Sequence, residues 1–106
     1  MAVLETVYSI NDVPIRLTDE RWYDHIVEQR PYMSSYYDNV LDAVEDPEYI
    51  LPGYKGALIA VVALGKRTFL HVVYVEVSRA DGFINTAYTK PSFDKGKIIW
   101  RRDDQE

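Results

Sequence analysis

Three apolar runs separated by two short polar turns constrain the fold more than any other feature of the chain. The runs are rich in valine, isoleucine, phenylalanine and tyrosine, which favour extended backbone. Gly65-Lys66 suits a two-residue hairpin turn, and residues 79–82 end in Asp-Gly, another turn sequence. Connections this short make consecutive strands pair antiparallel, so the sequence predicts a β-meander. Its strands are residues 57–64, 67–78 and 83–89.

The residues before the meander predict a hairpin and two helices. Residues 4–17 alternate around a central turn, and Pro14 predicts that the second strand of this hairpin lies at a sheet edge. Thr18 is a suitable helix N-cap, and apolar side chains at helical spacing predict a helix that ends near residue 29. A second amphipathic pattern predicts a helix over residues 32–45.

These elements predict an α+β fold, in which an N-terminal hairpin and two helices pack on a four-stranded, mostly antiparallel, twisted sheet. Residues 48–51 are a short extended piece, and residues 98–100 form a last strand or a docked tail. The length of 106 residues fits one domain. We expect that domain to span residues 1–106, with residues 101–106 as a disordered acidic tail.

Composition excludes several classes of function. The chain has no cysteine, which excludes disulfides and thiolate zinc sites and fits a reducing cytosol. No apolar stretch of about eighteen residues is present, and the first residues lack the pattern of a secretory signal, so we expect no membrane association. No Walker loop, dinucleotide fingerprint or clustered metal-ligand motif is present, so we expect no cofactor and no metal. We expect a cytoplasmic protein.

Charge is unevenly divided along the chain. The net charge is −5, yet residues 1–52 carry eleven acidic and three basic side chains, whereas residues 53–102 carry nine basic and three acidic ones. The predicted helical half is therefore acidic and the predicted sheet half basic. A basic face attracts phosphates even when the whole protein is acidic. The alternative interpretation is ordinary solvated charge on both halves.

Strand alternation distributes the meander's side chains over two faces, given a two-residue turn at Gly65-Lys66 and a four-residue loop at 79–82. A one-residue bulge would reverse this assignment. One face is mixed: it carries Arg67, His71, Thr86 and Tyr88, extended by Lys90, together with the apolar Phe69, Val73 and Val75. The face predicted to form the core under the helices carries Ile59, Val61, Leu70, Val72, Phe83 and Ala87.

Three segments have a more specific pattern: Arg21-Trp22 with His25-Ile26, Arg30-Pro31-Tyr32-Met33, and Gly82-Phe83-Ile84-Asn85-Thr86-Ala87-Tyr88. Together with the order of the elements, they resemble the phage barnase–EndoU–colicin–RelE-like nuclease group, small domains from phage and toxin–antitoxin loci. The resemblance covers roughly residues 13–100 and implies a single RelE/barnase-like domain with metal-independent endoribonuclease activity. That family often has His-Pro-Glu-Met at residues 30–33, and arginine in place of that histidine cannot shuttle protons.

Cleavage of this class uses the ribose 2′-hydroxyl as nucleophile, so the protein must transfer protons and stabilise a dianionic phosphorane. Histidine suits the proton transfer, and arginine and lysine suit the charge. The roles that the resemblance implies are proton transfer by His25, phosphate stabilisation by Arg30 and Lys66, phosphate orientation by Thr86, and stacking or proton donation by Tyr88. The further candidates for contacting RNA are Arg67, His71 and Lys90.

Each candidate also has a structural interpretation. His25 suits packing beside Trp22, His71 suits a partnered strand histidine, and Thr86 is β-branched in a strand it favours. A second hypothesis is therefore a non-catalytic protein- or RNA-binding module on the same scaffold. Burial of both histidines, each with a hydrogen-bond partner, would favour this hypothesis. RNA and a cognate antitoxin are the expected partners, and a homodimer is the assembly to be tested.

Overall fold

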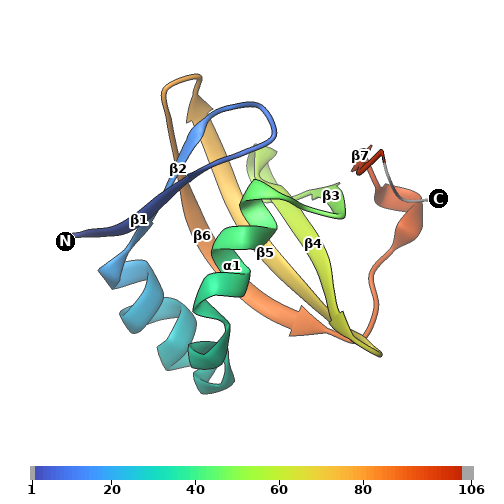
Figure 1. Ribbon diagram of the computed structural model, residues 1–106, viewed down its shortest axis with the longest axis horizontal. Coiled ribbons are helices and arrows are strands. Elements are labelled where there is room, and N and C mark those ends of the chain that lie inside the picture. Colours follow the sequence, from blue (N-terminus) through green and yellow to red (C-terminus); the bar gives the residue numbers. More distant parts are fainter. Residues whose placement is uncertain (1, 104–106) are drawn as a thin grey trace.

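The fold is organised by one seven-stranded mixed sheet in the computed structural model, which describes residues 2–103 (Figure 1). Within those residues the strand order is β1-β2-β6-β5-β4-β3-β7. Neighbouring strands are antiparallel, except that β2 and β6 run parallel. The strands are β1 (Val3–Tyr8), β2 (Pro14–Thr18), β3 (Tyr49–Pro52), β4 (Leu58–Gly65), β5 (Thr68–Ser78), β6 (Asp81–Lys90) and β7 (Trp100–Arg101).

Helical segments between β2 and β3 cover one face of the sheet (Figure 1). Thr18 Oγ1 accepts a hydrogen bond from the Arg21 amide at 3.2 Å, as expected of an N-capping side chain. Pro31 separates the first two helical segments, since proline restricts the residue before it and donates no amide. No helix in the described part of the chain is long and apolar enough to cross a membrane. The segments are η1 (Glu20–Val27, a π-helix), η2 (Pro31–Tyr36, a 3-10 helix) and α1 (Tyr37–Glu45); the short turns η3 (Tyr54–Gly56) and η4 (Lys95–Lys97) follow later.

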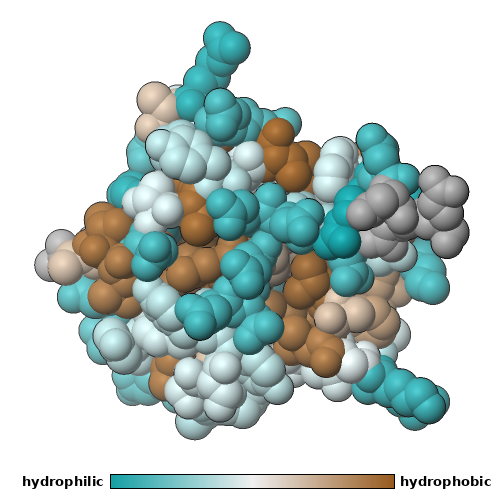
Figure 2. Space-filling model, in the orientation of Figure 1, coloured by the Kyte–Doolittle hydropathy of each residue, from teal (hydrophilic) through white to brown (hydrophobic). Residues whose placement is uncertain are grey.

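The hydrophobic core lies between these helices and the sheet. The curled sheet contacts α1 through β1 on one side and through β4 and β5 on the other. Hydrophilic side chains lie over α1 on its outward side (Figure 2). The Tyr74 hydroxyl is buried in this core without a hydrogen-bond partner among residues 2–103, and burial raises its pKa. The largest members of the core are Ile15, Leu17, Trp22, Ile26, Met33, Val40, Val44, Leu70, Val72, Tyr74 and Ile84.

The sheet corrects the expected fold. The α+β class stands, but the four-stranded, mostly antiparallel sheet with a separate N-terminal hairpin is wrong. β2 pairs with β6 through Ile15–Gly82 and Arg16–Phe83, so the hairpin continues the sheet instead of packing on it. On the other side, β3 and β7 extend the meander. Pro14 is accommodated in a strand that has neighbours on both sides because it is the first residue of β2.

Local irregularities shift the register that the turn lengths predicted. The β5–β6 connection has two residues rather than four, and the pairing shifts between Ala63 and Gly65, between Glu76 and Ser78, and beside Asn85. As a result His71 pairs with Tyr88, and Lys90 pairs with Phe69 rather than extending the row opposite His71. His71, Thr86 and Tyr88 do share the face that points away from the helices. Three residues expected in the helix-side core lie on that same face: Ile59, Val61 and Phe83.

The C-terminal segment returns to the sheet beside β3. β7 pairs with β3, and the Arg102 amide donates to the Glu48 carbonyl at 3.1 Å. The Arg102 guanidinium donates to the Asp46 carbonyl at 3.2 Å. Arg101 and Arg102, which the sequence assigned to the tail, thus contact the sheet. Residues 104–106 of the expected tail lie outside the described residues.

Candidate nucleic-acid interface

Aromatic and cationic side chains gather around Tyr88 near the end of β6. The Arg30 guanidinium carbon lies 5.3 Å from the centroid of the Tyr88 ring, and Lys90 Nζ lies 5.5 Å from it. His71 of β5 stacks on the same ring, with 5.2 Å between centroids and 20° between planes. The negative face of an aromatic ring attracts cations, so Tyr88 holds two positive groups that repel one another. These four side chains form what we call the Tyr88 cluster.

Neither cation of the Tyr88 cluster has an acidic partner among residues 2–103. The ion pairs found among residues 2–103 involve other arginines, and no carboxylate there lies within ion-pair distance of Arg30 or Lys90. Lys90 is exposed and Arg30 is partly exposed. Two unneutralised cations fixed beside one ring form a local positive site, even though the net charge of the chain is −5.

His71 supports the cluster from inside the protein. It is only 3% exposed, and its Nδ1 donates to the Phe69 carbonyl at 3.1 Å. Burial lowers the pKa of His71; the bond to Phe69 opposes this effect, and the charge of Lys90 adds to it. The imidazole is therefore neutral at neutral pH, and it holds Tyr88 by stacking while hidden from solvent.

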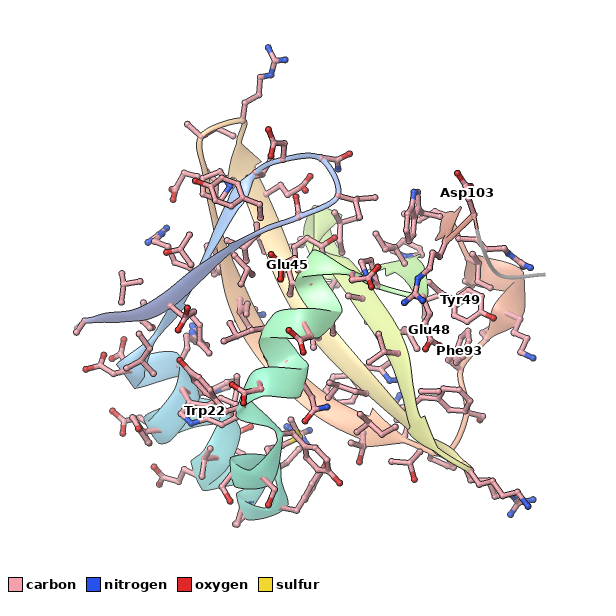
Figure 3. The ribbon with its side chains drawn as sticks, viewed as in Figure 1. Trp22, Glu45, Glu48, Tyr49, Phe93 and Asp103 are labelled. Carbon is pink, nitrogen blue, oxygen red and sulfur yellow. The ribbon has the colours of Figure 1, made fainter. Side chains whose placement is uncertain are left out.

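Phe93 closes this aromatic row from the C-terminal segment. Its ring centroid lies 5.2 Å from those of Tyr49 and Phe69, and 6.3 Å from that of His71. Figure 3 shows Phe93 beside Tyr49, on the segment that leads from β6 to β7. The face of the sheet away from the helices is thus covered at one end by Phe93.

His25 on η1 lies beside two arginines. Partial burial lowers the pKa of His25, and the positive charges of Arg21 and Arg30 lower it further. Burial raises the pKa of Tyr88, and Arg30 opposes that change. Arg30 therefore acts electrostatically on both His25 and Tyr88. A histidine that is neutral at pH 7 can accept a proton.

The remaining predicted site residues lie at different distances from the cluster. Thr86 is on the same face, two positions before Tyr88, and its Oγ1 is buried without a partner among residues 2–103. Lys66 and Arg67 form the exposed β4–β5 turn, where Arg67 has a φ of 57°. This turn lies at the same end of the sheet as Lys90. No hydrogen bond or ion pair joins it to the cluster within the described part of the chain.

Tyr32 blocks the edge of β6 beside the cluster. β2 pairs with β6 only at Gly82 and Phe83, which leaves the later part of β6 without a strand neighbour on that side. The Tyr32 hydroxyl accepts a hydrogen bond from the Thr89 amide at 3.2 Å. This bond satisfies an edge amide that would otherwise be free to pair with another chain.

Sequence reasoning missed the parts played by Tyr32 and Phe93. Tyr32 was singled out only as part of a motif, and its contact with Thr89 joins residues that are far apart in the sequence. Phe93 stands alone in an otherwise polar loop, and an isolated aromatic side chain in such a loop is the signal that would have identified it.

Comparisons with known proteins place the chain in no group: no protein-family model, curated protein or solved structure matches it. Among residues 2–103, no three His, Cys, Asp or Glu side chains are grouped so that they could hold a metal ion. The function of the protein must therefore be inferred from the chemistry of the Tyr88 cluster itself.

Proposed function

We propose that the protein binds single-stranded RNA at the Tyr88 cluster. The observation that carries the proposal is the pair of cations, Arg30 and Lys90, which one ring holds and which have no acidic partner in the described part of the chain. Phosphodiesters are the ligands that unpaired arginine and lysine side chains bind most readily. Because the Oγ1 of Thr86 is buried, a phosphate-orienting role for Thr86 stays a prediction of the sequence.

The binding test is a titration of fluorescein-labelled oligouridine, followed by fluorescence anisotropy. If Arg30 and Lys90 alone contact phosphates, affinity falls about sevenfold between about 50 and 200 mM salt, since each contact on a single strand contributes about 0.7 to the logarithmic slope. A DNA oligonucleotide of the same length is the comparison. Absence of binding at the lower salt concentration, or an affinity independent of salt, contradicts the proposal.

Endoribonuclease activity is the second candidate function, favoured by His25. The low pKa of His25 makes it a proton acceptor at neutral pH, and Arg30 beside it can stabilise the phosphorane. In this reaction His25 removes the proton of the ribose 2′-hydroxyl and the 2′-oxygen attacks the phosphorus. The bond to the 5′-oxygen breaks, that oxygen takes a proton from solvent water, and His25 returns its own proton to solvent. The products are a 2′,3′-cyclic phosphate and a 5′-hydroxyl.

We predict that His25→Gln lowers the rate of RNA cleavage by roughly 10²- to 10⁴-fold, the usual contribution of a general base. Because the base form exists above the pKa, the wild-type rate should rise with pH and reach half of its plateau at a pH below the ordinary histidine value of about 6.5. Mass spectrometry of the cyclic phosphate measures both effects. Glu28→Gln on the same helix is the control, and 2′-O-methyl RNA must resist cleavage. Equal rates in wild type and His25→Gln exclude the assigned role.

In this proposal His71 positions Tyr88 instead of contacting RNA, because it is almost fully buried. Lys66 and Arg67 contribute as outer phosphate contacts of a longer strand. A cognate antitoxin, a homodimer and a cytoplasmic location stay predictions of the sequence.

A further inference from the structure

A depression in the protein surface lies where β2 and β6 diverge. The strands pair at Ile15–Gly82 and Arg16–Phe83, after which β2 ends at Thr18 and the chain turns into η1. The resulting pocket has a volume of about 200 Å³. This is below the roughly 300–1,000 Å³ of pockets that enclose a whole small molecule, so it suits one part of a longer ligand. Its walls are Arg16, Thr18, Glu20, Arg21, Phe83 and Ile84.

The pocket combines one aromatic ring with unused cationic donors. Arg16 binds Asp81 through Nη2 at 2.8 Å, while its Nε is buried with no hydrogen-bond partner among residues 2–103. The side chain of Arg21 forms no ion pair in that part of the chain. The half-buried Phe83 lies opposite Val75, on the same face of the sheet as Tyr88. A nucleobase stacks on such a ring, and the adjacent phosphate or base edge can accept from the guanidinium groups.

The pocket adjoins another depression along η1. That depression is lined by Glu20, Arg21, Asp24 and His25, so it shares Glu20 and Arg21 with the pocket and reaches His25. Along β6, five positions separate Phe83 from Tyr88, a distance of about 15 Å at the usual rise per residue. That separation places two different nucleotides of one strand at the two sites.

We propose that the β2–β6 junction pocket is a second nucleotide subsite, so that a single RNA strand runs across the face of β6 that carries Phe83 and Tyr88, with one base on Phe83. This inference rests on the proposed function and narrows its substrate to unpaired RNA of several nucleotides. In an A-form duplex the bases are stacked and paired and cannot enter the pocket. Because the carboxylate of Glu20 also lines the pocket, we assign the phosphate to the guanidinium groups of Arg16 and Arg21 and the base to the Phe83 ring.

The test compares a uridine dinucleotide with a uridine hexanucleotide, both 2′-O-methylated to prevent cleavage, by isothermal titration calorimetry. Wild type should bind the hexanucleotide at least tenfold more tightly. Phe83→Leu and Arg21→Gln should each weaken the hexanucleotide about tenfold, in line with the loss of one stacked base or one charged contact, and leave the dinucleotide unchanged. Tyr54→Leu and Arg79→Gln are matched controls on exposed residues elsewhere, and thermal unfolding midpoints verify folding.

The outcomes separate the two proposals. Tight hexanucleotide binding by wild type with no loss in Phe83→Leu and Arg21→Gln overturns the subsite and leaves the proposed function standing. Equal loss for both oligonucleotides also overturns it, since the effect then belongs to the Tyr88 cluster. If wild type binds an RNA duplex of the same length as tightly as the single-stranded hexanucleotide, the restriction to unpaired RNA is wrong. Absence of binding to either oligonucleotide by wild type refutes the proposed function, and the subsite with it.

Discussion

Gly82→Ala is expected to lower the free energy of unfolding by about 3 kcal/mol, at the upper end of the cost of overpacking. A Cβ at this position would lie 2.5 Å from the Val75 carbonyl oxygen and 2.6 Å from Ile15 Cδ1. The Val75 oxygen belongs to the neighbouring strand and cannot rotate away. The methyl group must therefore separate β6 from β5, from β2, or from both.

Urea denaturation at equilibrium measures this effect as a lower midpoint at unchanged slope. Gly65→Ala is the matched control, because a Cβ on Gly65 meets nothing within 4 Å. Its effect should stay within about 0.5 kcal/mol, as for other surface substitutions. Equal midpoints for the two variants would show that the three strands do not meet as closely at Gly82 as described.

Removing the two cations from the Tyr88 cluster should have the largest effect on RNA affinity. Arg30→Gln and Lys90→Gln each delete one charged hydrogen-bond donor, worth about 1.5–3 kcal/mol, which corresponds to roughly 10- to 100-fold in the dissociation constant. The double variant should lose at least about 100-fold, since both cations serve one ligand. Each single substitution should also reduce the salt dependence of binding by about 0.7 in the logarithmic slope.

Fluorescence anisotropy with labelled oligouridine measures both quantities. Arg79→Gln is the control, because Arg79 is an exposed arginine in the β5–β6 turn, at the opposite end of the hairpin from Lys90. A general effect of net charge would weaken binding equally in Arg79→Gln and Arg30→Gln. That result would show that RNA is held by diffuse charge and that the Tyr88 cluster has no special part.

The elements of this fold could be predicted because their signals are local. Hydrophobic periodicity and turn residues identified the N-terminal hairpin, the helices and all three strands of the meander near their observed positions. The pairing of β2 with β6 could not be read in this way, because it joins residues that are distant in sequence and depends on shape complementarity at Gly82. Asp81-Gly82 was interpreted as a turn, whereas Gly82 lies inside β6 and allows a close approach of neighbouring strands.

The candidate site was predictable in part for the same reason. Strand alternation correctly put His71, Thr86 and Tyr88 on one face, but a two-residue β5–β6 turn and the extra residue at Asn85 changed which residues pair. The approach of Arg30 to Tyr88 depends on the direction that the chain takes after Pro31. A side-chain pattern carries no information on that direction, so the Tyr88 cluster became visible only in three dimensions.

The parallel contact between β2 and β6 has a consequence for synthesis on the ribosome. Ile15 can pair with Gly82 only after 67 further residues have been synthesised. The Ser9–Glu76 hydrogen bond across the same region joins residues that are equally far apart in the sequence. At usual translation rates that delay is roughly 3–13 s. During this interval the nascent hairpin presents the apolar side chains of Ile15 and Leu17 without their final neighbours, so its docking is a late step that closes the domain.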